Sequence, residues 1–401
     1  MTRRPETKRP LLLFTVNDAG FFLSHRLPIA QAAAAAGYDV QVATAPGPAV
    51  ARVIAEGFAH HAVPLSRRGL NPFAELRALW LLTRLYRRLK PDLIHHVTIK
   101  PVLIGGIAAR LARTPAMVSA VSGLGYVFIK PGWPARMLRL AVRAGYRLAL
   151  RRPGARVIFQ NPDDWHEFVG QKLIDPNAAV LIKGSGVDTA QFVVRLEPEG
   201  MPLVILPARM LWDKGVGEFV EAARSLRAQG FEARFALVGD SDPGNPTAIP
   251  ESRLRAWQDK GDVEWWGHRA DMAAVLAQAN VVCLPSYREG LPKSLIEAAA
   301  CGCAIVACDV PGCREIARHD ENALLVPPRD PIALAEALRK LIADPQLRQR
   351  MGQRGRSMVE AEFSLERVVA ETLATYAALL RETGGCAPLA TQEDSLRCSP
   401  S

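Results

Sequence analysis

The 401-residue sequence contains no long hydrophobic run and no obvious targeting segment. No stretch of 18 or more residues is both apolar and uncharged, which argues against a membrane-spanning helix. Residues 1–10 lead directly into a short apolar strand instead of the apolar region of a signal peptide. We therefore expect a cytosolic protein.

The seven cysteines lack C-x-x-C spacing, although five of them lie between Cys283 and Cys313. An odd number of cysteines in a chain expected in the cytosol favours reduced thiols. Cys301 and Cys303 are only two positions apart, so we interpret them as small buried hydrophobic residues and expect no metal there.

Signatures of two functional classes are also missing. The G-x-G-x-x-G fingerprint of dinucleotide-binding enzymes is absent, which argues against a nicotinamide-dependent dehydrogenase. There is no zinc-finger spacing, helix-turn-helix signal or basic strand interleaved with aromatic residues, so we expect no nucleic-acid partner.

The composition is that of a globular protein, with 49% hydrophobic and 22% charged residues. A chain of 401 residues exceeds the size at which one hydrophobic core stops growing, which predicts two domains. Residues 1–190 carry 26 Lys and Arg against 11 Asp and Glu, whereas residues 191–401 carry 24 against 29. The +15 charge of the first half suits a nucleic acid, an anionic membrane or a polyanionic substrate, and charge alone does not choose among them.

Short apolar runs alternate with helical patterns through both halves, which predicts two parallel, doubly wound sheets. The strands predicted in the first half are Leu11–Val16, Val40–Ala45, Ala62–Leu65, Asp92–His95, Ala116–Val121 and Arg156–Phe159. Those of the second half are Leu203–Leu206, Ala233–Val238, Val263–Trp266, Val281–Leu284, Ala304–Ala307 and Ala323–Val326. The predicted helices include Leu23–Ala36, Phe73–Leu89, Val102–Ala112, Ala135–Leu150, Val216–Ala228 and Leu291–Ala300.

The predicted fold class is α/β, with two Rossmann-like, doubly wound lobes that face a central cleft. We expect an N-terminal lobe over residues 1–183, a linker over 184–200 and a C-terminal lobe over 201–363. A helix over 364–381 is expected to pack back on the N-terminal lobe, and residues 382–401 are expected to form a disordered tail.

The turn after the strand Val281–Leu284 carries an acidic residue, a glycine and the start of a helix. Glu289 is expected to face the cleft, and Gly290 lets a ligand approach the backbone. With Pro292 as the first helical residue, the free amides of residues 291–294 and the helix dipole form an anion site suited to a diphosphate. The plainer alternative is a strand–helix turn whose glutamates merely favour the helix N-terminus.

Two cations follow the first strand of the second lobe and are expected at the same edge of the sheet. Arg209 and Lys214 are five residues apart and fit a diphosphate, because Arg presents a planar fork and Lys a compact charge. Alone, such a pair is more often surface charge. Its combination on one face with a helix N-terminus, Glu289 and Glu297 favours a binding site.

Four elements together resemble family 4 of the retaining glycosyltransferases, which have the GT-B fold. They are the R-x4-K-G element that begins at Arg209, the strand end Leu237–Asp240, the segment Trp266–Arg269 and the E-x7-E element from Glu289 to Glu297. The resemblance extends to about residue 381. It implies an acceptor-binding N-terminal lobe and a nucleotide-sugar-binding C-terminal lobe. It also implies transfer of a hexose or N-acetylhexosamine with retention of anomeric configuration.

The resemblance further implies a role for each site residue. Glu289 and the amides after it hold the donor hexose, and Glu297 holds the ribose hydroxyls. Arg209 and Lys214 hold the diphosphate, and residues 265–269 border the nucleobase. Glu289, Arg209 and Lys214 are accordingly expected to be catalytic. The expected donor-binding residues are Gly20, Gly267, His268, Gly290, Leu291, Pro292, Lys293, Ser294 and Glu297.

Two turns of the first lobe supply further candidate contacts to donor or acceptor. Gly20 and His25 follow the first strand, and Lys100 follows the fourth. Many family members have H-x-H at the end of the fourth strand, whereas this chain has His95 and His96 followed by a valine. Either histidine is a candidate contact, and a buried structural role is the alternative.

The segments FFLSHRLP, VTIKP, Val121–Tyr126 and Phe159–Pro162 are similar to a bacterial subgroup that acts on undecaprenyl diphosphate-linked sugars. The similarity implies a lipid-linked glycan acceptor in polysaccharide, lipopolysaccharide or capsule assembly, and a peripheral position on the inner face of the cell membrane. A helical arginine stripe fits an anionic membrane or, alternatively, the solvated face of a core helix. It comprises Arg136, Arg139, Arg143, Arg147 and Arg151.

No metal or other cofactor is expected beyond the nucleotide sugar, a co-substrate that we expect to be UDP-linked. Asp240-Ser241-Asp242 mimics a metal-binding D-x-D motif. Because Arg209 and Lys214 already supply positive charge, magnesium is expected to be at most stimulatory. The alternative functions are a nucleotide-sugar epimerase or hydrolase on the same fold and, from another class, a nucleic-acid-binding protein.

Overall fold

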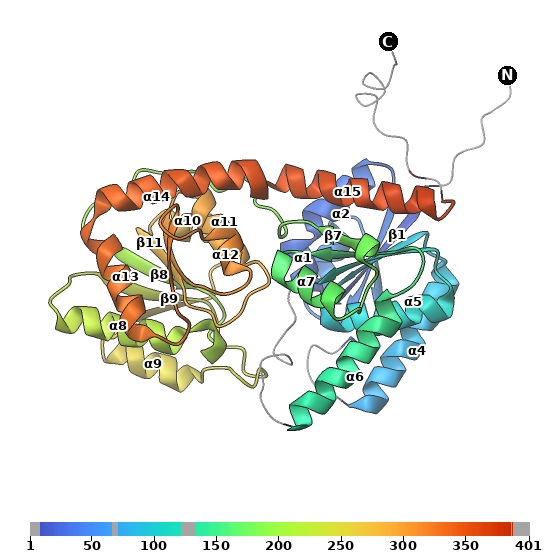
Figure 1. Ribbon diagram of the computed structural model, residues 1–401, viewed down its shortest axis with the longest axis horizontal. Helices are drawn as coiled ribbons and strands as arrows, with labels where there is room; N and C mark the ends of the chain where they lie inside the picture. Colours follow the sequence, from blue (N-terminus) through green and yellow to red (C-terminus); the bar gives the residue numbers. More distant parts are fainter. Residues whose placement is uncertain (1–8, 66–70, 122–132, 386, 388–401) are drawn as a thin grey trace, which may run out of the picture. The chain divides into compact units, whose positions relative to one another are not determined.

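The computed structural model consists of two compact units (Figure 1). It describes residues 9–65, 71–121, 133–385 and 387, and for residues 133–138 it describes the backbone alone. Unit 1 comprises Met1–Ile182 and Val369–Ser401, and unit 2 comprises Lys183–Val368. Residues 184–200, expected to form a linker, belong to unit 2 by their contacts.

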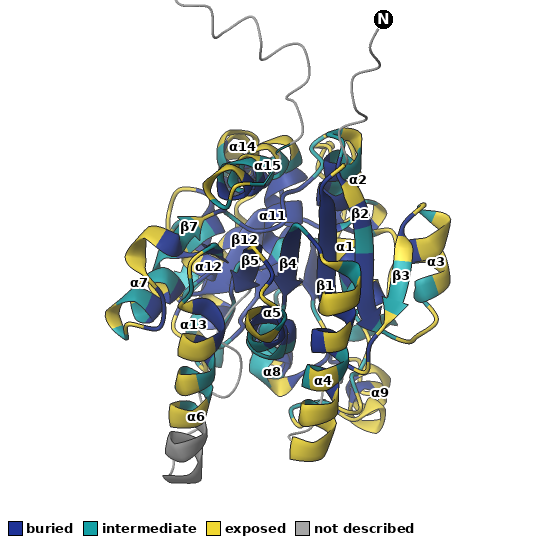
Figure 2. Ribbon diagram, turned by 90° about the vertical axis from the view of Figure 1, so that its right-hand side faces the viewer, coloured by how far each residue is buried: buried dark blue, intermediate teal, exposed yellow. Residues whose placement is uncertain are grey.

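Unit 1 is built on a seven-stranded parallel sheet with the order β3-β2-β1-β4-β5-β6-β7. Its strands are β1 (Leu11–Asp18), β2 (Asp39–Ala45), β3 (Ala59–Ala62), β4 (Leu93–Val97), β5 (Ala116–Val121), β6 (Ala155–Phe159) and β7 (Ala179–Leu181). The central strands β1 and β4 are largely buried (Figure 2), as expected where helices cover both faces. The strand order reverses between β1 and β4, and we call this position the switch point of unit 1.

Helices cover both faces of the sheet in unit 1. They are α1 (Ala19–His25), α2 (Leu27–Ala35), α3 (Val50–Ala55), α4 (Pro72–Leu89), the π-helix η1 (Pro101–Gly105), α5 (Gly106–Ala112), α6 (Trp133–Leu150), α7 (Pro162–Gly170), η3 (Pro176–Ala178) and α15 (Leu365–Glu382). On one face, α4 and α6 contribute Tyr86 and Tyr146 to the core. On the other face, the Tyr376 hydroxyl of α15 is hydrogen-bonded to the His95 imidazole.

Unit 2 has a six-stranded parallel sheet with the order β10-β9-β8-β11-β12-β13, and its switch point lies between β8 and β11. Its strands are β8 (Leu203–Pro207), β9 (Arg234–Val238), β10 (Glu264–Gly267), β11 (Val281–Leu284), β12 (Ala304–Cys308) and β13 (Ala323–Val326). Its helices are η4 (Trp212–Lys214), α8 (Val216–Ala228), α9 (Glu251–Asp259), α10 (Met272–Leu276), α11 (Lys293–Ala300), α12 (Cys313–Ile316), α13 (Pro331–Ala343), α14 (Pro345–Met358) and η5 (Val359–Phe363). α8 packs on α13, and α11 packs on α14.

The structure confirms two doubly wound sheets and corrects several local predictions. The helix predicted over Leu23–Ala36 is two helices, α1 and α2, that meet at Arg26, because Pro28 has no N–H to continue a single helix. The strand predicted over Ala62–Leu65 lies three residues earlier, as β3, where its backbone pairs with β2. The edge strand β7 is apolar, but its three residues are too few for their pattern to distinguish a strand from a loop.

Candidate functional site

Several of the predicted site residues lie at the carboxyl ends of the strands that border the switch point of each sheet. In unit 2, Arg209 and Lys214 follow β8, and Glu289 follows its neighbour β11. In unit 1, Gly20 follows β1 and Lys100 follows its neighbour β4. Doubly wound sheets bind ligands at such positions, because the loops diverge there and leave a crevice.

A short ion pair joins Lys214 and Glu289. Lys214 Nζ lies 2.5 Å from Glu289 Oε1, and the two side chains are only 17% and 13% exposed. The loops that carry them are tied together, because the Tyr287 N–H donates a hydrogen bond to the Asp213 carbonyl at 3.0 Å. Partial burial strengthens the attraction relative to that of an exposed pair. A cation and a carboxylate therefore stand side by side at the switch point of unit 2.

Arg209 takes its partner from the loop after β9. Its Nη1 lies 2.9 Å from Asp242 Oδ2, and its side chain is 49% exposed. The two loops are joined by a hydrogen bond from the Met210 N–H to the Asp240 carbonyl at 3.0 Å. Asp242 thus neutralises an arginine, and no group of three or more metal-ligating side chains occurs among the described residues.

Two glycines allow close approach between the loops of the unit 2 site. Gly215 has φ +71°, and a Cβ added to it would lie 2.2 Å from the Pro285 carbonyl oxygen. Gly312 has φ +80°, and its added Cβ would lie 2.3 Å from the carbonyl oxygen of Gly290 and 2.7 Å from that of Glu289. Any other residue at either position would displace backbone. Gly312 therefore supports the site, although no sequence motif indicates it.

Helix α11 begins at Lys293, two residues after the start of the predicted range Leu291–Ala300, and Pro292 is its N-cap and not its first residue. No side chain caps this end, so the partial positive charge of the helix terminus remains available at the switch point. Glu297 lies one turn further along; it is 7% exposed, and its Oε1 is 3.3 Å from Lys293 Nζ. Burial raises the pKa of Glu297, and the Lys293 ammonium opposes this only in part. Glu297 is therefore a buried carboxyl held rigidly by α11.

The segment predicted to border the nucleobase is anchored to the loop after β9. The His268 N–H donates a hydrogen bond to Asp240 Oδ1 at 2.8 Å, and the indole N–H of Trp265 donates one to the Gly239 carbonyl at 2.9 Å. Gly267 has φ +64°, a conformation that glycine adopts without strain. The structure therefore places Gly267 and His268 at the same edge of the sheet as the two cations.

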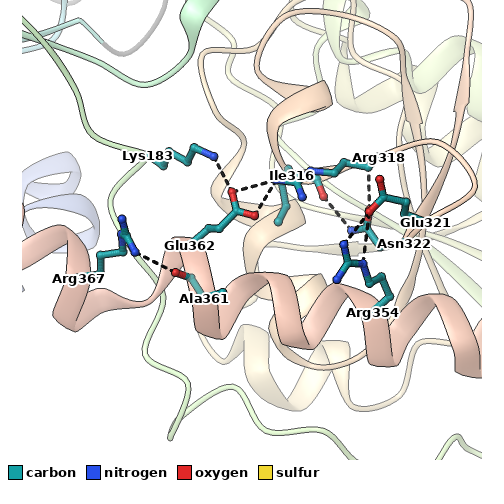
Figure 3. A network of polar contacts seen from close by, with 9 residues as sticks. All are labelled: Lys183, Ile316, Arg318, Glu321, Asn322, Arg354, Ala361, Glu362 and Arg367. Atoms are coloured by element: carbon teal, nitrogen blue, oxygen red, sulfur yellow. Dashed lines mark hydrogen bonds and ion pairs between the residues drawn. The ribbon is translucent and has the colours of Figure 1, made fainter.

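A network of ion pairs centred on Glu362 connects distant segments of unit 2 (Figure 3). Glu362 Oε2 lies 2.6 Å from Lys183 Nζ, and Glu362 Oε1 lies 2.7 Å from Arg318 Nη2. Burial alone would raise the pKa of Glu362, but the two cations outweigh burial and lower it. Beside Lys183, an added Cβ on Gly184 would lie 2.9 Å from Leu291 Cδ2. The network thus holds the segment against which the loop after β11 packs.

In unit 1, the turn after β1 is fixed by short-range hydrogen bonds. The Asp18 carboxylate accepts one from the Phe21 N–H at 2.8 Å, which orders the turn that contains Gly20. The His25 ring stacks on Phe21 with the centroids 4.1 Å apart, and its Nδ1 lies 2.7 Å from Ser24 Oγ. Gly20 is exposed and His25 is half-buried, so both are accessible at this edge of the sheet.

His95 and His96 are buried in unit 1 and point to opposite faces of β4. His95 Nδ1 is hydrogen-bonded to the Tyr376 hydroxyl, and His96 Nε2 lies 3.1 Å from the Tyr86 hydroxyl. The two residues are 1% and 0% exposed. Burial lowers the pKa of His95 well below its usual value and that of His96 to about 3, so both rings are neutral near pH 7. The structure therefore gives both histidines partners inside unit 1.

Helix α4 presents an apolar face to solvent that the sequence pattern did not single out. Phe73, Leu76 and Trp80 are 80%, 62% and 58% exposed. They recur every three or four residues on one side of the helix, whose first turns are exposed (Figure 2). On the same helix, the Glu75 carboxylate pairs with Lys100. Three large apolar side chains exposed on one side of a helix make this face a candidate interaction surface.

In the arginine stripe predicted over residues 136–151, Arg147 and Arg151 are exposed and Arg139 and Arg143 are half-buried. Arg147 donates hydrogen bonds to the carbonyls of Gln171 and Lys172 at 3.1 and 3.2 Å. The side chain of Arg136 lies outside the described residues, as do residues 122–126 of the subgroup segment Val121–Tyr126. No helix in the described part of the chain is both long and apolar enough to cross a membrane.

Comparison with known proteins gives matches for both units. The family described as glycosyl transferases group 1 matches residues 201–344, and the family described as glycosyl transferase 4-like matches residues 11–161. The N,N'-diacetylbacillosaminyl-diphospho-undecaprenol alpha-1,3-N-acetylgalactosaminyltransferase of Campylobacter jejuni is 32% identical over 296 residues, which cover 71% of this chain and 76% of that protein.

Two further proteins extend the comparison. The capsular polysaccharide biosynthesis glycosyltransferase CapM of Staphylococcus aureus is 25% identical over 337 residues, which cover 81% of this chain and 86% of that protein. The crystal structure of HepE from Anabaena in complex with UDP-glucose has a TM-score of 0.73 at 20% identity and covers 91% of this chain and 99% of that chain. Such structural likenesses confirm the predicted GT-B fold class.

Proposed function

The chain belongs to the group 1 and family-4-like glycosyltransferases, and from this membership we propose its reaction. A hexose or N-acetylhexosamine moves from a UDP-linked sugar to a lipid-diphosphate-linked sugar during assembly of a cell-surface polysaccharide. The name of the Campylobacter jejuni relative and the UDP-glucose bound by HepE support this choice of substrates. In the structure, the proposal is carried by the Lys214–Glu289 pair at the switch point of unit 2.

The proposed transfer retains the anomeric configuration, so the acceptor oxygen arrives on the face from which the diphosphate leaves. The bond between the anomeric carbon and the diphosphate oxygen breaks, and a bond from that carbon to the acceptor oxygen forms. The hydroxyl proton passes to the departing phosphate. Negative charge grows on the diphosphate in this step, so Arg209, Lys214 and the N-terminus of α11 lower the barrier by stabilising that charge.

The two carboxylates are proposed to position the donor and not to attack it. Lys214 contacts Glu289 through Oε1, and Oε2 is the atom proposed to accept a hydrogen bond from a hexose hydroxyl. Glu297, buried on α11, is proposed to accept hydrogen bonds from the ribose. In this arrangement Lys214 bridges Glu289 and the diphosphate, which aligns the sugar with its leaving group.

The test combines purified protein with bacterial membrane extract and a panel of UDP- and GDP-sugars, and identifies the glycolipid by mass spectrometry. Lys214→Ala and Glu289→Ala are expected to lower transfer by about 10²-fold or more without unfolding the protein. Arg224→Ala serves as the control, because it removes an ion pair with Asp262 elsewhere in unit 2 and is expected to leave transfer unchanged. Near-normal transfer by both site variants would refute the assignment. Turnover of donor without acceptor would instead indicate an epimerase or hydrolase.

The exposed face of α4 supports a peripheral position on an anionic membrane. Phe73, Leu76 and Trp80 form its apolar part. Arg77 and Arg84 lie on the same helix, and the Arg84 guanidinium is 5.5 Å from the centre of the Trp80 ring. An apolar face with an arginine fringe is what a helix in the membrane interface presents, and each basic residue near an anionic leaflet adds about 1 kcal/mol of attraction.

Flotation with liposomes of phosphatidylglycerol and phosphatidylcholine tests this position. The double variant Phe73→Ser/Trp80→Ser is expected to weaken binding by about 10-fold or more, because two large apolar side chains no longer enter the interface. Ile332→Ser is the matched control, since it replaces a 72% exposed apolar residue of unit 2. Equal binding by the double variant and the wild type would exclude α4 as the contact.

A further inference from the structure

Thr98 has an unusual backbone conformation at the carboxyl end of β4. Among the described non-glycine residues with positive φ, it alone is β-branched, and its φ is +75°. Lys90 and Arg113 also have positive φ, but each occupies the C-cap of a helix, where that conformation is common. For a β-branched residue it is a true outlier, and such outliers concentrate at ligand-binding positions.

The chain leaves Thr98 through a second uncommon element. The Thr98 carbonyl accepts a hydrogen bond from the Val102 N–H at 3.0 Å, and the π-helix η1 begins at Pro101. Single π-helical turns occur frequently at functional sites. Two independent departures from regular backbone therefore coincide at the switch point of unit 1.

Two buried oxygens at this position lack partners. Thr98 Oγ1 and Asn17 Oδ1 make no hydrogen bond to any described residue. Asn17 lies in β1 and Thr98 directly follows β4, and the last residues paired between these two adjacent strands are Val16 and Val97. A buried oxygen without a donor is unfavourable, so few such atoms occur in native proteins.

We propose that Asn17 and Thr98 form a subsite for the acceptor sugar and accept hydrogen bonds from its hydroxyl or amide N–H groups. The inference rests on the proposed function. Asn17 Oδ1 can only accept a hydrogen bond, so it suits a hydroxyl or N–H donor of a sugar and not a diphosphate oxygen, whereas the Thr98 hydroxyl can both accept and donate. The unit 2 site already offers cations for the donor diphosphate and carboxylates for the donor hydroxyls.

Asn17 and Thr98 are each half-buried as residues, so part of each residue is accessible at the carboxyl edge of the sheet. Acceptor binding would then satisfy both atoms and compensate for the strained backbone of Thr98. The free protein holds the subsite at the expense of its own stability, as binding sites often do.

Three variants test the subsite through acceptor KM, donor KM and the melting temperature. Thr98→Gly removes both strain and hydroxyl; we expect Tm to rise by about 2–4 °C and acceptor KM to rise by about 3- to 10-fold. Asn17→Ala is expected to raise acceptor KM by a similar factor. Thr98→Ser keeps the hydroxyl and is expected to keep acceptor KM near the wild-type value. Donor KM is expected to be unchanged in all three.

Arg113→Gly is the matched control, because it also relieves a positive φ, +55°, at an exposed position away from the switch point. It is expected to raise Tm and leave acceptor KM unchanged. An acceptor KM unchanged in active Thr98→Gly and Asn17→Ala would overturn this subsite alone. Failure of the wild-type protein to glycosylate any sugar-diphosphate lipid would overturn the subsite together with the proposed function.

Discussion

Gly312→Ala tests whether the close approach of two backbone segments at the unit 2 site is needed for activity. A Cβ added at this position would lie 2.3 Å from the Gly290 carbonyl oxygen, whereas ordinary contacts begin near 3.4 Å. Gly312→Ala must therefore separate the two backbones by about 1 Å, and a misplacement of that size near a reacting centre lowers a rate by about 10²-fold. Glu289 moves with Gly290, so the loss is expected in kcat/KM for the donor.

Backbone conformation contributes a second, separable effect. Gly312 has φ +80° and ψ −43°, a conformation that residues with a side chain rarely adopt, so Gly312→Ala is also expected to lose folding stability through backbone strain. Gly230 has φ +81° and no heavy atom within 4 Å of its added Cβ. Gly230→Ala therefore introduces positive-φ strain without displacing any neighbour, and it is expected to lose stability while it keeps its activity.

The assay measures kcat/KM for the donor and urea unfolding by circular dichroism in both variants. Gly312→Ala is expected to lose about 10²-fold in kcat/KM and more stability than Gly230→Ala. The reasoning is wrong if folded Gly312→Ala retains the wild-type kcat/KM. It is equally wrong if Gly230→Ala loses as much activity, because strain alone would then explain both results.

Three further predictions concern acid, the Glu362 network and metal ions. The buried His96 has a folded pKa of about 3 against 6.5 in the unfolded chain, so stability is complete above pH 6.5 and falls as the unfolded state takes up protons. Because of His96 alone, the free energy of unfolding is expected to fall by about 2 kcal/mol between pH 7 and pH 5. His95 is expected to increase this loss, and urea unfolding at the two pH values measures it. Glu362→Gln is expected to raise donor KM. Glu321→Gln removes only an exposed ion pair and is expected to leave donor KM unchanged. Because protein cations serve the diphosphate, transfer is expected to survive EDTA, and an absolute requirement for Mg²⁺ would contradict that role.

Much of the fold was predictable because the periodicity of apolar residues along the chain indicates helices and strands. Val281–Leu284 and Val216–Ala228 are predicted at the observed bounds, since a buried parallel strand is a short apolar run and an amphipathic helix repeats apolar residues on one face. β3 is placed wrongly because an edge strand is exposed on both faces and shows little pattern. Only backbone pairing with β2 defines its bounds.

The part of the candidate site that could be predicted consists of motifs that directly follow neighbouring strands of one sheet. Lys214 and Glu289 each follow a strand, and neighbouring parallel strands bring them to one edge of a sheet. The supporting residues could not be predicted in this way. Gly312 acts through its contact with Gly290, and Glu362 through an ion pair with Lys183, 179 positions away in the chain.

By itself the sequence determined the family, the two doubly wound sheets and the residues at their strand ends, because short motifs and apolar periodicity are local properties. Only the tertiary structure decided which charges pair, as Arg209 does with Asp242. It also decided that His95 and His96 are buried and neutral and that Phe73, Leu76 and Trp80 of α4 are exposed. Burial and pairing depend on segments that meet only after the chain has folded, so they cannot be predicted from the local sequence pattern.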